Sequence, residues 1–159
     1  MLADRGREDE AASGFEELLH SHPELPDLRY DLGMLYRKQR QWDKALVVFH
    51  QELDANPKEE RAAARVSEAL EQLTRWQDLR DFLAPRMQHR SPPLWACLDF
   101  AKALENLGEN SEAIHVLDIA LASYPSSKPV HWRLLHLYRL SGDMQKASAE
   151  ANWFKSQPE

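Results

Sequence analysis

Alanine recurs at a fixed spacing of 34 residues along this chain of 159 residues. The recurring sites are Ala11, Ala45, Ala113 and Ala147, and Leu79 fills the one gap in the series. Further columns align at the same spacing without an insertion, and three of them hold Phe15, Phe49, Leu83, Leu117 and Ala151; Leu32, Val66, Phe100 and Leu134; and Tyr36, Leu70, Leu104 and Tyr138. A period in this range is typical of a solenoid built from one repeated supersecondary unit.

Each unit has apolar residues at helical spacing, with one interruption near its middle. In the unit 26–59, Leu32 and Tyr36 mark the first segment, and Ala45 and Phe49 mark the second. The interruption is marked by a glycine column, which holds Gly6, Gly108 and Gly142. Because Ala, Leu, Glu, Gln, Arg and Lys are abundant, both segments are expected to be helices.

The period predicts an all-α superhelix of nine helices without a β-strand. We expect a single array over 1–159, which divides into a half repeat (1–25) and four full repeats (26–59, 60–93, 94–127 and 128–159). The repeat 60–93 is the least regular, since Leu79 replaces the alanine and Ser67 stands in the column of Gly33.

The repeat 26–59 resembles the tetratricopeptide repeat (TPR) family. That family has Leu-Gly-x-x-Tyr in its first helix, then Ala-x-x-x-Phe and a closing proline in its second. The matching residues are Leu32, Gly33, Tyr36, Ala45, Phe49 and Pro57. The resemblance covers the whole chain and implies a stack of helix pairs whose first helices line a concave groove, where a peptide or protein partner binds.

Both ends of the array lack a polar capping helix. Ala11 and Phe15 show a second-helix pattern whose first helix is missing, while Trp153 and Phe154 lie on the last helix. Solenoids need capping elements, because each unit buries its apolar surface only against a neighbour. Three explanations stay open: a segment of a longer array, self-association through the terminal helices, or terminal helices that tolerate exposure.

Composition argues against several classes of partner. A net charge of −6 disfavours nucleic acid. The sequence contains no apolar run of the ~20 residues that would span a bilayer. There is no signal-peptide pattern in this segment, and the single cysteine favours a reducing compartment such as the cytoplasm, although localisation stays open.

Residues with catalytic or metal-binding chemistry are few. His20 and His22 form a His-x-His pair beside Pro23, but no cysteine or acidic cluster with metal-site spacing accompanies them. Cys97 has no histidine partner nearby in the sequence. We therefore predict a protein that is not an enzyme, with no cofactor and no metal.

Charged residues alternate in sign along one column of the expected groove. The column holds Asp31, Arg65, Asp99 and Arg133, and a second column places Asp27 beside Arg61. Since neighbouring first helices lie side by side in TPR proteins, this ladder is expected to form ion pairs between repeats. Such pairs fix the register of the repeats, and their opposite charges leave little net electrostatic field to attract a strongly charged ligand.

The carboxylate clamp, through which some TPR proteins hold chaperone tails, is matched only in part. Arg61 and Arg65 stand at two basic clamp positions. Asp31 stands where the clamp has an asparagine, and it would repel a carboxylate. The helix with the remaining clamp residues is missing, so this reading is disfavoured.

Aromatic and basic residues of the last two repeats form a better candidate binding patch. It consists of Trp95, Leu98, Trp132, Arg133, His136 and Arg139, and a smaller apolar spot consists of Tyr30 and Met34. Exposed tryptophan and arginine are typical binding hot spots. The alternative is that the tryptophans belong to the core.

These observations predict a protein-interaction scaffold or adaptor that binds a peptide or protein in its groove. The alternative is a non-catalytic regulatory or positioning segment of a larger multidomain enzyme, and fold alone does not distinguish the two. RNA binding by the helical surface is the least favoured reading, given the acidic balance.

Overall fold

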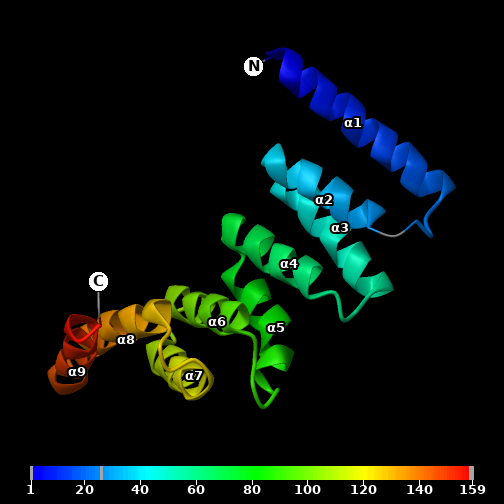
Figure 1. Cartoon of the computed structure of the whole chain (residues 1–159). Coiled ribbons are helices and arrows are strands. Elements are labelled where there is room, and N and C mark those ends of the chain that lie inside the picture. The colour runs from blue at the N-terminus through cyan, green and yellow to red at the C-terminus, as the bar shows by residue number, and fades with distance from the viewer. Residues whose placement is uncertain (1, 26, 158–159) are drawn as a thin grey trace. The chain divides into compact units, whose positions relative to one another are not determined.

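The computed structural model describes residues 2–25 and 27–157, so that the outer ends of the first and last repeats and Pro26 lie outside the description. Nine α-helices and no strand make up this described part, as the period predicts (Figure 1). None of these helices is both long and apolar enough to cross a membrane. The helices are α1 (Leu2–Ser21), α2 (Leu28–Lys38), α3 (Trp42–Ala55), α4 (Glu60–Gln72), α5 (Trp76–Met87), α6 (Leu94–Asn106), α7 (Asn110–Ser123), α8 (Lys128–Ser141) and α9 (Met144–Lys155).

The chain forms two compact units, Met1–Arg75 and Trp76–Glu159. The first unit contains α1 to α4 and the second contains α5 to α9, and consecutive helices pack against one another within each unit. The boundary falls inside the repeat 60–93, which is also the least regular repeat in the sequence. That the repeats form a single array stays a prediction.

The turn between the two helices of each full repeat has a left-handed residue at the same repeat position. Gly108 and Gly142 have φ values of 80° and 78° there, and Arg40 and Thr74 have 59° and 54°. Glycine adopts this conformation without steric cost, whereas a β-branched residue such as threonine is strained. Gly6, the fifth member of the column, instead lies inside α1.

The repeat columns form the core of each helix pair. Ala45, Phe49, Ala113 and Leu117 are fully buried in α3 and α7. Gly33 of α2 lies directly under the ring of Phe49, since a Cβ atom added to Gly33 would lie 2.5 Å from Phe49 Cε1. The small residue expected in this column therefore allows α2 and α3 to approach closely.

The first helix, α1, corresponds to the second helix of a repeat. α1 buries Ala12, which shares its column with Leu46 of α3, and leaves Ala11 exposed. In α3 and α7 the equivalents of Ala11 are buried. α1 thus packs on α2 through the side that a second helix turns toward the next repeat, and the side that carries Ala11 is exposed in the described part of the chain.

Candidate functional site

The candidate site is a row of exposed side chains along α8. Trp132 is 60% exposed, and its ring stacks on that of His136, with centroids 5.9 Å apart and planes inclined by 6°. Because residues four apart share a helix face, the row continues to Leu140, which is 62% exposed. We call this surface the α8 stripe; its exposed residues are Lys128, Trp132, His136, Arg139 and Leu140.

The other members of the expected patch are less accessible. Trp95 and Leu98 of α6 are half-buried. Arg133 is half-buried as well, and its Nη1 donates to Glu105 Oε1 of α6 at 2.8 Å. The structure therefore brings Trp132 and His136 together with Arg139, while Arg133 is engaged in an ion pair of the scaffold.

The smaller apolar spot on α2 is largely packed. The Tyr30 ring lies 5.8 Å from the ring of Phe49, and the guanidinium of Arg61 lies 5.0 Å from the Tyr30 centroid. Met34 is half-buried. Tyr30 accordingly contributes to the packing between repeats.

Ion pairs do link neighbouring first helices. Arg61 Nη2 of α4 lies 3.1 Å from Asp27 Oδ1, at the start of α2, which is the pair that the repeat columns suggest. Arg37 Nη2 of α2 lies 2.7 Å from Glu68 Oε1 of α4. Together with Arg133 and Glu105, these pairs tie one repeat to the next inside each unit.

The ladder residues themselves have other neighbours. Arg65 bonds Glu68 on its own helix, and Asp31 is exposed. Asp99 is also engaged in an interaction, and it belongs to a different unit from Arg65. Pairing within the ladder of Asp31, Arg65, Asp99 and Arg133 stays a prediction.

The two arginines at clamp positions are already neutralised. Arg61 Nε donates to Glu59 Oε1 at 2.9 Å in addition to its contact with Asp27, and this hydrogen bond lowers the pKa of Glu59. Arg65 is paired with Glu68. A free acidic tail would have to displace these carboxylates, which disfavours a clamp at this position.

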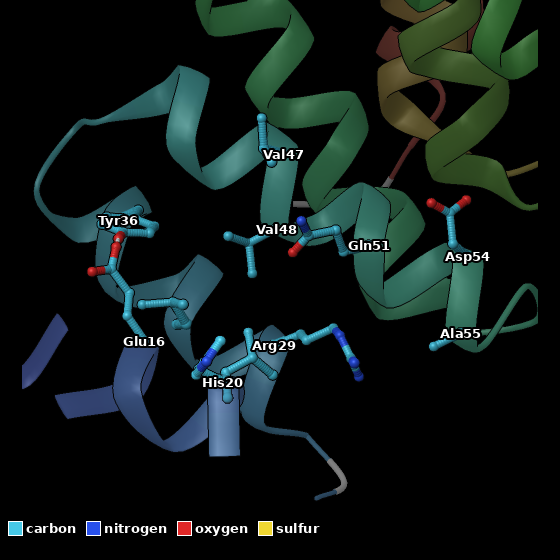
Figure 2. A pocket seen from close by; sticks show the side chains of 11 residues that line it. Glu16, His20, Arg29, Tyr36, Val47, Val48, Gln51, Asp54 and Ala55 are labelled. Atoms are coloured by element: carbon cyan, nitrogen blue, oxygen red, sulfur yellow. Dashed lines mark hydrogen bonds between the residues drawn. The ribbon is translucent and has the colours of Figure 1, made fainter. Parts of the chain in front are cut away.

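A pocket of about 740 Å³ lies in the first unit among α1, α2 and α3 (Figure 2). Leu32 and Val48 lie among its apolar lining residues, and the hydroxyl of Tyr36 donates to Glu16 at one side. The repeat columns do not predict this pocket, because its lining combines two second helices, α1 and α3, with α2, whereas the expected groove is lined by first helices. The available signal was Val47, an apolar residue outside the core columns of α3 that is 56% exposed.

The aromatic residues of the last helix are partly covered. Trp153 stacks on His131 with centroids 3.6 Å apart, and Phe154 packs edge-on against the same ring. His131 is buried; its Nε2 donates to the Pro125 carbonyl at 2.9 Å, and its Nδ1 lies 2.6 Å from Glu150 Oε2. These contacts cover part of the apolar surface of Trp153 and Phe154 within the chain itself. Self-association through the last helix stays a prediction.

The residues considered for catalysis show no catalytic arrangement. His22 Nδ1 lies 3.3 Å from Glu24 Oε1 on the surface. Cys97 is buried, and its burial raises the pKa of the thiol, so the nucleophilic thiolate is disfavoured. Within residues 9–25 and 27–157, no group of three or more histidine, cysteine or acidic side chains could hold a metal ion.

Models of the tetratricopeptide repeat match residues 2–73 and residues 98–152. The chain belongs to the tetratricopeptide repeat family, whose members are typically non-catalytic scaffolds, and this supports a protein-interaction module in general.

Solved structures of MamA have a similar fold. MamA of Desulfovibrio magneticus RS-1, from residue 41 to its end, is 18% identical, with a TM-score of 0.74 over 99% of this chain and 91% of that one. A crystal structure of MamA is 16% identical, with a TM-score of 0.78 over 93% and 86% of the two chains. MamA MSR-1 is 22% identical, with a TM-score of 0.71 over 93% and 85%. At these identities the likeness shows the fold alone, and no curated protein matches the chain.

Proposed function

We propose that this protein is a non-enzymatic interaction module that binds a peptide or protein partner on the α8 stripe. The observation that carries the proposal is the exposed, stacked pair of Trp132 and His136. A large ring already held flat against a neighbour presents apolar area with little further loss of side-chain freedom on binding. Trp95 and Leu98, which are half-buried on α6, would extend the contact surface.

The acidic balance of the chain and the paired arginines on α4 are the reasons to favour a protein over a nucleic acid. The alternative, a positioning segment of a larger enzyme, would use the same stripe to hold a neighbouring domain. Comparing the isolated chain with its full gene product separates the two readings, because only the second reading requires a catalytic domain in the same polypeptide.

The test is a selection of random peptides displayed on phage against the folded chain, followed by binding measurements on variants. Trp132→Ala is expected to weaken the binding of the selected peptides by about 2 kcal/mol or more. The same substitution is expected to change the free energy of unfolding by less than about 1 kcal/mol. Ile119→Ala is the matched control, since Ile119 is an exposed apolar residue of α7. If the selected peptides bind both variants as well as the original chain, the stripe is not the site.

A further inference from the structure

The exposed side of α8 is positively charged in a chain whose net charge is −6. The 14 residues of α8 include no aspartate or glutamate, and its stripe carries Lys128 at one end and Arg139 near the other. The beginning of α8 adds to this charge, because its N-cap Ser127 makes no side-chain capping bond and the first turn holds no acidic residue.

The acidic groups on α6 and at α9 are already engaged. Glu105 of α6 accepts from Arg133, and Asp143, the N-cap of α9, accepts from the Lys146 backbone N–H and lies near the Lys146 ammonium. Glu150 of α9 lies against His131. Asp99 of α6 is engaged as well. These carboxylates are therefore occupied, which leaves Lys128 and Arg139 to pair with carboxylates from a partner.

Apolar surface runs between the two basic ends. At the start of α8 a pocket of about 460 Å³ is lined by Leu94, Tyr124 and Pro129 together with Lys128. One turn further along, the stacked rings of Trp132 and His136 continue the surface toward Leu140. Lys128 and Arg139 are about 16 Å apart along the helix axis, the span of roughly five extended residues.

We propose that the partner is an internal acidic segment that carries one or two large apolar side chains. Its apolar side chains pack on Trp132 and in the pocket at the start of α8, and its carboxylates contact Lys128 and Arg139. This inference rests on the proposed function of the stripe and adds the chemical class of the ligand. Because Lys128 and Arg139 stand at opposite ends of the apolar surface, carboxylates on both sides of the apolar residues, as in an internal segment, match the stripe better than a single terminal carboxylate.

The experiment compares two synthetic peptides by fluorescence anisotropy at low salt, both acetylated and amidated so that neither has a terminal charge. The acidic probe is Asp-Glu-Leu-Phe-Glu-Glu, and the matched probe is Asn-Gln-Leu-Phe-Gln-Gln. The acidic probe is expected to bind roughly five-fold tighter or more, and Arg139→Glu is expected to reduce that preference by roughly three- to ten-fold. Lys155→Glu, on α9, makes the same change in net charge outside the stripe and is expected to leave the preference unchanged.

The outcomes separate the two proposals. Equal binding of both peptides, lost in Trp132→Ala, overturns the acidic ligand and keeps the stripe as a binding surface. An acidic preference that survives Arg139→Glu, or is lost equally in Lys155→Glu, also overturns it. If the acidic probe does not bind at millimolar concentration, the proposal of an acidic ligand is wrong. If either probe binds the Trp132→Ala variant as tightly as the original chain, the stripe is not the binding surface.

Discussion

Tyr138 of α8 donates a hydrogen bond to Asp118 of α7, which lies 20 residues earlier, at 3.2 Å. The same contact occurs three repeats before, where Tyr36 of α2 donates to Glu16 of α1, also 20 residues earlier. In the two repeats between them the tyrosine column holds Leu70 and Leu104, and the column of the acceptors holds His50 and Ala84. An acidic acceptor therefore accompanies the hydroxyl wherever the first helix provides one.

Tyr138→Phe tests the energy of this contact. The substitution removes the hydroxyl and keeps the ring, so we expect the free energy of unfolding to fall by roughly 1.5 to 3 kcal/mol, the range for a hydrogen bond to a charged group. Urea unfolding of the single variants and of the double variant with Asp118→Ala gives the coupling energy. Additive effects of the two substitutions would show that the hydroxyl and the carboxylate do not stabilise each other.

Alkaline pH should weaken the fold through the same two tyrosines. Burial, together with the neighbouring carboxylate, raises the pKa of both Tyr36 and Tyr138 to about 12 from an ordinary value of 10.0. The folded chain thus holds these protons more tightly than the unfolded chain, so their contribution is complete below about pH 10 and is lost as the pH rises through about 12. Urea midpoints between these pH values should fall less in the double variant Tyr36→Phe, Tyr138→Phe than in the original chain. A parallel fall in both would assign the pH effect to other groups.

Thr74→Gly should stabilise the first unit. Thr74 has a φ of 54° in the turn that follows α4, a conformation that costs a β-branched residue about 1 to 2 kcal/mol. Glycine removes that strain but makes the unfolded chain more flexible, so we expect a net gain of about 0.5 to 1 kcal/mol. Gly108→Ala is the reverse control, since Gly108 has a φ of 80° and no other group within 4 Å of an added Cβ. It should lose about 1 kcal/mol, and a gain there would contradict the explanation.

Gly33→Ala and Gly14→Ala should change stability in opposite directions. Both glycines are helical, but a Cβ on Gly33 meets the buried ring of Phe49, whereas a Cβ on Gly14 meets open space. Overpacking predicts a loss of about 1 to 3 kcal/mol for Gly33→Ala. Better helix propensity predicts a gain of about 0.5 to 1 kcal/mol for Gly14→Ala. Thermal unfolding of the two variants side by side measures the contrast, and equal shifts would refute it.

The 34-residue period is sufficient to predict the helices, because each column constrains the same packing contact several times. It correctly places the turns at Gly108 and Gly142 and pairs Asp27 with Arg61. Gly6 shows the limit of the pattern: it shares the column of these two glycines, yet α1 continues as helix through that position and reaches 20 residues.

Side-chain partners were harder to predict than helices. Arg65 has a long, flexible side chain, and it pairs with Glu68 one turn along its own helix, a contact that the repeat columns do not predict. The contact of Trp153 with His131 depends on the angle between α8 and α9, which no column encodes. The pocket of the first unit depends on the space between α1 and α3, and sequence spacing alone does not give that distance.

The fit of Gly33 under Phe49 has a consequence for recombination among the repeats. Along the chain the two columns vary in opposite directions: glycine stands with Phe49, Ala101 with Leu117, and Leu135 with Ala151. A chimera that combined the first helix of 128–159 with the second helix of 26–59 would bring a leucine against the phenylalanine ring. The reverse chimera would bring glycine against Ala151 and leave a void. The exchangeable module is therefore the complete helix pair, and a crossover within the turn would separate residues that are fitted to each other.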